Sequence, residues 1–251
     1  MKIIIAPTKK MVINTNDFDV QGLPQYIEET RQILQKMQTL SYEDAHTMWR
    51  CSDKLARQNY NWLQQMNLDA QLTPAILAYT GIQYQYMAPD LFTAPALDYV
   101  QRNLRILSGF YGILRPFDGV IPYRLEMQSA IQVADAHDLY EFWSNKLYQT
   151  LHFEQGPVLN LASQEYAKAI TPYLQPDDRM INVIFGSKVN GQLKVKATLA
   201  KMARGEMVRY LAENNIHDVA AITRFDHPDW HYDAARSTDS EFVFINNERQ
   251  H

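Results

Sequence analysis

The 251-residue sequence predicts an α/β (α+β) fold in which helices surround a mixed sheet. Short apolar runs, such as Lys2 to Ala6 and Val158 to Leu161, are typical of buried strands. They alternate with longer segments in which apolar residues recur at the helical period. No repeat, low-complexity tract or Pro/Gly/Ser-rich linker interrupts the chain, so we predict one compact domain over residues 1–251. The strand order does not follow from the sequence.

The composition is that of an ordinary globular protein, with 46% hydrophobic and 21% charged residues. No apolar run approaches the roughly 20 residues that a membrane-spanning helix needs, and the start MKIIIAPTKK is too short for a signal-peptide core. The single cysteine, Cys51, excludes an internal disulfide. We therefore expect a cytoplasmic protein without membrane contact. The net charge of −4 argues mildly against nucleic acid as a partner but leaves room for a local basic cleft.

In the first half of the chain, Pro24 in the first turn favours a helix from Leu23 to Leu40. Ser41 with Asp44 resembles a capping box for a second long helix. The helical spacing predicts that the following residues form its apolar stripe, with Cys51 as a small buried hydrophobe: Met48, Cys51, Leu55, Trp62 and Met66. Asp53 and Arg57 have the spacing of a surface ion pair. A short strand is predicted over Ala75 to Tyr79 and a helix over Ala96 to Leu107.

The second half continues the mixture of strands and helices. The pattern predicts helices over Leu139 to Leu151 and Ala197 to Glu213, and a short helix capped by Ser163. Further strands are predicted over Met180 to Phe185, Lys194 to Lys196 and Glu241 to Ile245. Asn190-Gly191 predicts a hairpin because both residues tolerate positive φ.

The stretch LSGFYGILRPFDGVIPYRLEM, residues 107–127, is the most distinctive part of the sequence. Arg115 to Gly119 has the chemistry of a tight turn, since proline presets φ and Asp-Gly suits the exit. After Pro122, alternation predicts a strand with Arg124 and Glu126 on one face. Such a pair can brace the structure or bind a ligand, and the residues alone favour neither interpretation.

Gly109 and Gly112 have the spacing of a helix-hairpin-helix element, in which backbone N–H groups meet phosphate. A simple glycine-containing turn is the common alternative, and Pro116 leaves little room for a long second helix.

Basic residues gather in clusters that could line an anion-binding groove. They are Lys9, Lys10, Arg102, Arg105, Lys194, Lys196, Lys201, Arg204 and Arg209. On a helix that begins at Ala197, Lys201 and Arg204 share one side. A solvated charged face is the ordinary alternative.

The sequence has no P-loop, G-x-S-x-G, H-E-x-x-H or dinucleotide fingerprint. His227 and His231 are the only histidines at ligand-like spacing, and Pro228 between them disfavours a helical metal face. We predict no metal site and no cofactor.

Several segments together resemble the YaaA family. They are APTKKM, CSDKLA, LRILSGFYGILRPFDGVIPYRLEM, LYEFWSNKL, VLNLASQEY and KMARGEMVRYL, in this order over nearly the whole chain. The resemblance implies a cytosolic bacterial protein that responds to hydroperoxide and limits iron-dependent oxidative damage to DNA. It also implies a compact YaaA-type fold with a basic cleft and a helix-hairpin-helix-like element that bind DNA. Carried onto this sequence, the binding residues would be Lys9, Lys54, Gly109, Gly112, Arg115, Arg124, Lys196, Lys201 and Arg204. The chain departs from the family pattern at Arg224 and Trp230, which puts any role of Asp239 in doubt.

Two functions compete on these grounds. The first is a DNA-binding stress protein that uses the basic cleft and hairpin. The second is an enzyme acting on a phosphorylated small molecule or nucleotide, in which Lys9, Arg115 and Arg124 clamp the anion and Glu126 or Asp118 is the base. Direct iron handling has little support from one cysteine and scattered histidines.

Overall fold

The residues that the computed structural model describes, 1–15 and 17–247, fold around an eight-stranded mixed sheet. The strand order is β4-β3-β1-β6-β7-β10-β9, and β8 pairs with β7 outside this path. Strands β3, β1, β6, β7 and β10 run parallel, whereas β4, β8 and β9 are antiparallel to their neighbours. The strands of this sheet are β1 (Lys2–Ile5), β3 (Leu104–Ser108), β4 (Gly112–Leu114), β6 (Val158–Leu161), β7 (Met180–Val189), β8 (Gln192–Lys194), β9 (Trp230–Tyr232) and β10 (Glu241–Asn246). A separate two-stranded sheet pairs β2 (Thr73–Pro74) with β5 (Gly119–Val120).

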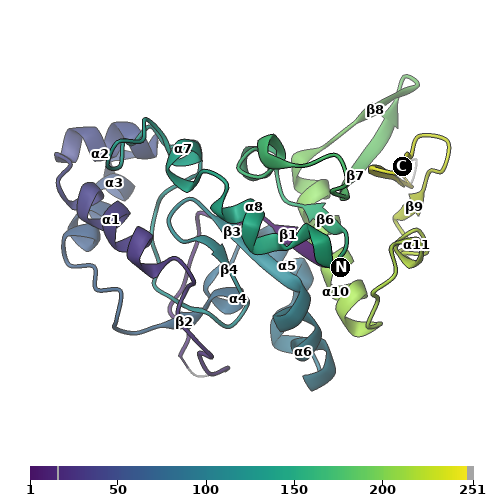
Figure 1. Ribbon diagram of the computed structural model, residues 1–251, viewed down its shortest axis with the longest axis horizontal. Helices are drawn as coiled ribbons and strands as arrows, with labels where there is room; N and C mark the ends of the chain where they lie inside the picture. Colours follow the sequence, from purple (N-terminus) through teal and green to yellow (C-terminus); the bar gives the residue numbers. More distant parts are fainter. Residues whose placement is uncertain (16, 248–251) are drawn as a thin grey trace.

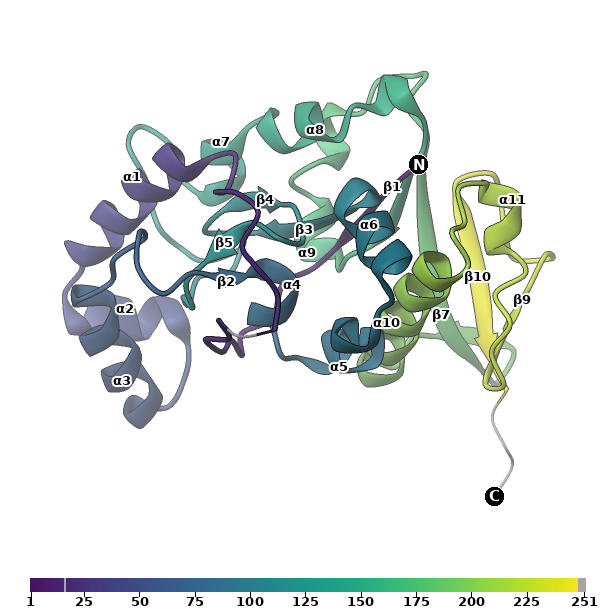
Figure 2. The ribbon, with the colours of Figure 1, turned by 90° about the horizontal axis from the view of Figure 1, so that it is seen from below.

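Helices cover the central sheet on both sides. Figure 2 shows α5, α6 and α10 on one side and α7 and α8 on the other. Covering both faces explains why every residue of β6 is buried and why Ile3, Ile4 and Ile5 of β1 are fully buried. The α-helices are α1 (Ile27–Gln38), α2 (Tyr42–Trp49), α3 (Asp53–Gln64), α4 (Ala75–Ala78), α5 (Ile82–Met87), α6 (Ala94–Asn103), α7 (Leu139–Trp143), α8 (Lys146–Leu151), α9 (Gln164–Ala167), α10 (Ala197–Glu213) and α11 (Val219–Ile222). Short 3₁₀ turns lie at Pro89–Leu91, Phe153–Gln155 and Thr171–Tyr173.

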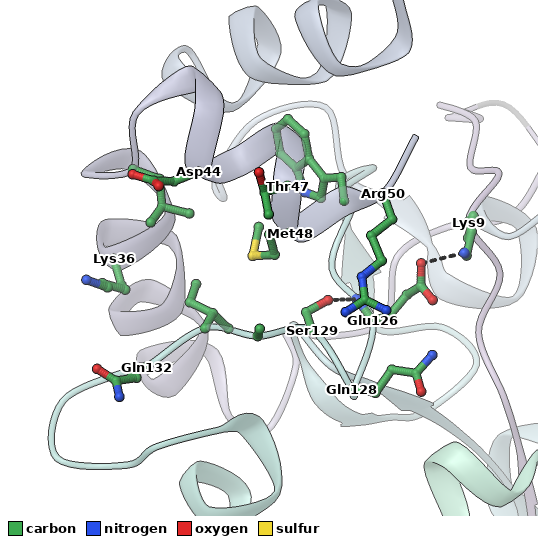
Figure 3. A pocket seen from close by; sticks show the side chains of 14 residues that line it. Lys9, Lys36, Asp44, Thr47, Met48, Arg50, Glu126, Gln128, Ser129 and Gln132 are labelled. Carbon is green, nitrogen blue, oxygen red and sulfur yellow. Dashed lines mark hydrogen bonds and ion pairs between the residues drawn. The ribbon is translucent and has the colours of Figure 1, made fainter. Parts of the chain in front are cut away.

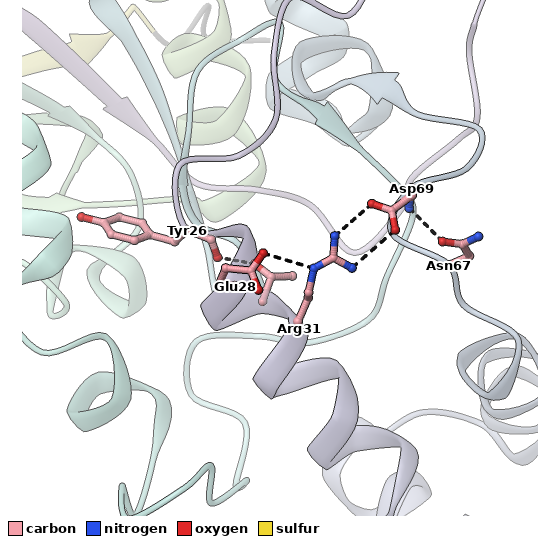
Figure 4. A network of polar contacts seen from close by, with 6 residues as sticks. Tyr26, Glu28, Arg31, Asn67 and Asp69 are labelled. Carbon is pink, nitrogen blue, oxygen red and sulfur yellow. Dashed lines mark hydrogen bonds and ion pairs between the residues drawn. The ribbon is translucent and has the colours of Figure 1, made fainter.

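Helices α1, α2 and α3 lie together at one end of the molecule, and β9, β10 and α11 lie at the other (Figure 1). Arg31 ties α1 to the loop after α3, because its guanidinium donates to Asp69 Oδ1 at 3.0 Å and to Glu28 Oε1 at 3.4 Å (Figure 4). These side chains are solvent-exposed, so the network fixes orientation more than it adds stability. None of the described helices is both long and apolar enough to cross a membrane.

The mixed α/β class is confirmed, and so are several of the predicted elements. The strands predicted at the N-terminus, after Val158, after Met180 and at Glu241 all form, as does α10. The Asn190-Gly191 hairpin forms with φ of 52° and 77° at the two residues. Ser41 caps α2 by accepting the Asp44 N–H at 3.1 Å, and Arg57 pairs with Asp53 at 2.9 Å.

The predicted second helix is in fact two helices, because α2 ends where Arg50 adopts a left-handed φ of 46°. The break changes which residues face the core, so the predicted apolar stripe is wrong. Leu55 and Trp62 are 37% and 36% exposed, while Trp49, Ala56 and Leu63 are buried instead. Cys51 is partly buried against the core.

Three further element predictions are corrected. Ala75–Ala78 is a helical turn rather than a strand. The helix predicted over 139–151 is interrupted at Ser144, where the backbone leaves the helical region. Helix α6 stops at Asn103 because the chain enters β3, whose residues pair with β1.

The distinctive stretch is a β-hairpin followed by an extended segment. Strands β3 and β4 pair with Ser108 opposite Gly112, so the stretch around Gly109 and Gly112 is a hairpin between two strands. The predicted strand after Pro122 does not form, since this segment has no strand partner among the described residues. Its alternation nonetheless persists: Tyr123 and Leu125 are buried while Arg124 and Glu126 are half-buried.

Candidate anion-binding site

A cavity of about 620 Å³ lies where β1 and β6 end. The loop at residues 6–10 follows β1, and Ser163 and Glu165 follow β6, and all of these line the cavity. From β1 the chain passes to β3 on one side, and it later returns to β6 on the other side. The cavity therefore lies outside the carboxyl ends of parallel strands at a topological switch point, where α/β proteins bind ligands.

Helices α5 and α10 form a second wall, and their close contact determines what faces the cavity. A Cβ on Gly205 of α10 would lie 2.1 Å from the carbonyl oxygen of Gln83 on α5, so only glycine permits this approach. Lys201 and Arg204 are three residues apart on α10 and share one side of it. Both line the cavity together with Gln83.

The extended segment 123–126 forms the third wall. The Trp49 indole N–H donates to the Arg124 carbonyl at 2.7 Å, and Arg124 Nη2 donates back to the Trp49 carbonyl at 3.5 Å. These bonds hold Arg124 between α2 and the cavity. Below it, the Tyr123 hydroxyl is hydrogen-bonded to Ser108 Oγ at 2.7 Å and to the Tyr79 hydroxyl at 2.9 Å. Burial raises the pKa of Tyr123 to about 12, so this floor is neutral at physiological pH.

Cations outnumber carboxylates around the cavity. The cations are Lys9, Lys10, Arg124, Lys201 and Arg204, and the carboxylates are Glu126 and Glu165. Lys9 Nζ lies 2.6 Å from Glu126 Oε1. Burial raises the pKa of Glu165, and the negative charge of Glu126 raises it further. The Gln128 N–H donates to the Glu165 carboxylate at 3.3 Å, and this hydrogen bond lowers the pKa. The cavity thus has an excess of positive charge beside a carboxyl whose pKa is raised.

Three buried side-chain atoms in the described part of the chain lack a hydrogen-bond partner: Gln83 Nε2, Arg124 Nε and Arg204 Nε. All three are N–H donors, and all three residues line this one cavity. Gln83 is only 5% exposed, and burial lowers the pKa of Arg204. Because an unpaired buried donor destabilises a fold, such groups call for an explanation, and acceptor oxygens of a ligand would supply one.

A second cavity of about 450 Å³ adjoins the first, since Lys9 and Glu126 line both. It lies between the end of α2 and the segment 126–132 (Figure 3). Arg50 at the end of α2 points toward the segment that carries Glu126 and Ser129.

The structure divides the residues predicted from the sequence into two groups. Lys9, Arg124, Glu126, Lys201 and Arg204 converge on the first cavity. Arg115 and Asp118 line a different cavity of about 320 Å³, together with Arg105 and His152. The fold therefore does not bring Arg115 to the same cavity as Lys9 and Arg124, and the three residues cannot clamp one anion together.

In that smaller cavity, Asp118 is buried and fully paired. Its carboxylate accepts the Arg115 backbone N–H at 2.8 Å and Arg115 Nε at 3.0 Å. Burial raises the pKa of Asp118, and the bonds from Arg115 oppose the rise. The geometry is that of a structural brace for the turn.

The remaining predicted residues lie outside the first cavity. Lys54 is exposed in the first turn of α3, and Lys196 is the residue that precedes α10. Gly109 and Gly112 have structural reasons to be glycine. A Cβ on Gly109 would lie 2.8 Å from the backbone carbon of Glu126, and Gly112 has a φ of 74° beside Trp143.

Sequence reasoning missed several lining residues, notably Gln83, Glu165 and Tyr166. Glu165 and Tyr166 follow within five residues of a predicted strand, which the structure shows to be parallel to its neighbours, and ligand-binding loops gather at the carboxyl ends of such strands. Gln83 carries no such signal, since only the packing of α5 on α10 brings it to the cavity. Within the described residues, no group of three or more His, Cys, Asp or Glu side chains could hold a metal ion.

Comparison with known proteins places this chain in a family. Residues 1–236 match the family described as "Peroxide stress protein YaaA". The chain is 60% identical over 245 residues to a "UPF0246 protein" of Lactiplantibacillus plantarum, covering 98% of this chain and 99% of the relative. It is 52% identical over 248 residues to a "UPF0246 protein" of Pediococcus pentosaceus, covering 99% of each. It is 48% identical over 248 residues to one of Lachnoclostridium phytofermentans, covering 99% and 97%. The chain therefore belongs to the YaaA family of peroxide stress proteins.

Proposed function

We propose that this YaaA-family protein acts in peroxide stress by binding a phosphate- or carboxylate-bearing small molecule, such as a nucleotide, in the first cavity. The observation that carries the proposal is the set of unpartnered buried donors on Gln83, Arg124 and Arg204, all of which line that cavity. Oxygens of an anion would satisfy these donors, and charge-assisted hydrogen bonds of this kind are the strong ones.

The size of the cavity supports a small molecule. Its volume of about 620 Å³ is typical of pockets that bind cofactors and metabolites, which span roughly 300–1,000 Å³. The buried tyrosine floor offers an apolar surface beside the cations, which suits a ligand with both a ring and an anionic group. Glu126 and Glu165 stand next to the cations and would supply a proton acceptor or donor if the bound molecule reacts. We further propose that the protein works in the cytoplasm.

A thermal-shift screen of phosphorylated and carboxylated metabolites tests the proposal. A ligand present at one hundred times its Kd stabilises the fold by about 2.7 kcal/mol, which for this chain length raises Tm by roughly 5–10 °C. Arg204→Met should abolish the shift, while Arg57→Met on the surface of α3 should retain it. If no anionic compound raises Tm of the intact protein, this function is wrong.

DNA binding is the second candidate, and the position of the basic residues favours it. Lys196 immediately precedes α10, Lys201 and Arg204 lie in its first half, and these last two line the same cavity as the exposed Lys9 and Lys10. The phosphate backbone of DNA could lie over the opening of this cavity, and bound DNA would then be protected from iron-dependent damage.

Fluorescence anisotropy with duplex, nicked and junction DNA tests this idea. Binding should weaken with salt by roughly one unit of log–log slope per phosphate contact. Absence of binding at low salt, alongside a metabolite-induced rise in Tm, would leave only the first function.

A further inference from the structure

The Lys9–Glu126 ion pair lies between two adjoining cavities, which together we call the groove. Both residues line the cationic cavity at the carboxyl ends of β1 and β6, and both line the cavity beside α2. The Lys9 side chain is 58% exposed, so its ammonium can turn toward either side without losing a buried contact. A ligand that spans both cavities would pass beside this exposed ion pair.

Arg50 gives the second cavity a cation without a carboxylate partner. Its guanidinium points toward the segment that carries Glu126 and Ser129 (Figure 3). Across residues 1–15 and 17–247, no Asp or Glu side chain forms an ion pair with Arg50. This positive charge is thus available to an external anion.

The backbone at Arg50 strengthens this interpretation. The residue follows α2 in the left-handed conformation, with φ of 46° and its N–H donating to the His46 carbonyl at 3.1 Å. Glycine is the ordinary residue at such a position, because an L-residue there carries a conformational penalty. The stability of the end of α2 therefore does not explain why residue 50 is an arginine.

Neutral donors stand opposite Arg50. Ser129 is 8% exposed, and its Oγ accepts the Glu126 N–H at 3.0 Å, which leaves its own O–H to donate into the cavity. The side chains of Gln128 and Gln132 also line this cavity. The charged residues that line this cavity are the cations Lys9, Lys36 and Arg50 and the carboxylates Asp44 and Glu126. Cations outnumber carboxylates, and the neutral donors add to them, so the cavity suits a second oxyanion group better than a cationic one.

We propose that the groove binds a small molecule with two separate anionic groups. One group would lie against Arg124, Lys201 and Arg204 and the other against Arg50, with Lys9 between them. The inference rests on the proposed function and narrows its ligand to compounds such as bisphosphates or phosphate–carboxylate molecules. Two linked anions would gain affinity through the high effective concentration of the second group once the first is bound.

Isothermal titration calorimetry of the full chain tests the two-anion proposal. The ligands are a series of α,ω-alkylene bisphosphonates with increasing spacer length, and methylphosphonate is the reference. We expect one spacer length to bind at least about tenfold more tightly than methylphosphonate. Arg50→Gly should abolish that gain and leave methylphosphonate binding unchanged. Because glycine suits the left-handed position, the Tm of this variant should be equal or higher, so a loss of affinity would not reflect unfolding.

The remaining outcomes are distinct. If methylphosphonate binds but no spacer length improves on it, or if Arg50→Gly retains the gain, the two-anion groove is wrong and the proposed function stands. If neither methylphosphonate nor any bisphosphonate binds, both are overturned. Arg57→Gly, on the exposed face of α3, is the matched control and should retain the spacer-dependent gain.

Discussion

The Lys9 ammonium and the Glu126 carboxylate lie 2.6 Å apart at the junction of the two cavities. The two residues come from distant parts of the chain, one after the first strand and the other in the extended segment after β5. Their side chains are 58% and 24% exposed, so the pair adds less than about 1 kcal/mol to folding. Its greater effect is on charge in the groove, because each partner neutralises the other.

Removing one partner or the other should therefore change anion affinity in opposite directions. Glu126→Gln frees the Lys9 ammonium and removes a repulsive charge, which should raise the affinity for inorganic pyrophosphate roughly three- to tenfold at low salt. Lys9→Met should lower it by a similar factor. Isothermal titration calorimetry measures both. Asp53→Asn breaks a comparable surface pair on α3 and should change nothing. Shifts of the same sign in the two groove variants would contradict this account of the pair.

Gln83 should show a trade-off between stability and binding. Its Nε2 is buried without a partner, so replacing the amide by the similar-sized Gln83→Met removes a desolvation penalty. We expect the free energy of unfolding, from urea denaturation, to rise by about 1 kcal/mol. Binding of the anionic ligand should weaken, since a donor is lost. Gln85→Met, at an exposed position of the same helix, should leave stability within about 0.5 kcal/mol. A destabilised Gln83→Met protein would mean that the amide has a partner in solution.

The elements that the sequence predicted well are those whose pattern is local. The isoleucines of β1, the Asn190-Gly191 turn and the Ser41 cap each depend on a few neighbouring residues. The failures depend on distant partners. Residues 104–108 continue a helical pattern but become a strand because β1 offers them a hydrogen-bonded edge. The helix break at Arg50 could not be predicted from the sequence, because arginine, like other L-residues, disfavours the left-handed conformation that it adopts there.

The candidate site divides in the same way. Lys201 and Arg204 could be paired by helical spacing, and Arg124 and Glu126 by alternation. That these pairs meet Lys9 rather than Arg115 depends on strand order, which the sequence did not provide. Arg115 instead turns back on its own tight turn to pair with Asp118.

Gly109→Ala tests whether this glycine serves packing. An added Cβ would lie 2.8 Å from the Glu126 backbone carbon and 2.9 Å from the Met127 nitrogen, and backbone atoms cannot move aside as a flexible side chain can. We expect a loss of about 1–3 kcal/mol in the free energy of unfolding, with weaker anion binding because the segment carrying Glu126 shifts. Gly191→Asn is the control, since nothing lies within 4 Å of an added Cβ there and asparagine tolerates its positive φ. Unchanged stability in Gly109→Ala would mean that the hairpin and this segment separate easily.

Glu165 should make stability depend on pH in a defined direction. Burial, with the charge of Glu126, raises its pKa in the folded state above the ordinary glutamate value. Between these two pKa values the native state holds more protons than the unfolded state, so stability falls as pH rises through that interval. Glu165→Gln removes the effect and keeps an oxygen that can accept the Gln128 N–H.

The variant should therefore gain stability relative to the wild type as pH rises, and the difference should level off above the folded-state pKa of Glu165. Urea denaturation of both proteins at a series of pH values measures it. Anion affinity should also fall as pH rises, because an ionised Glu165 repels the ligand and a protonated Glu165 does not. Wild-type binding of inorganic pyrophosphate should weaken through the same interval more steeply than binding to Glu165→Gln. A stability difference that stays constant with pH would show that Glu165 does not titrate at a raised pKa.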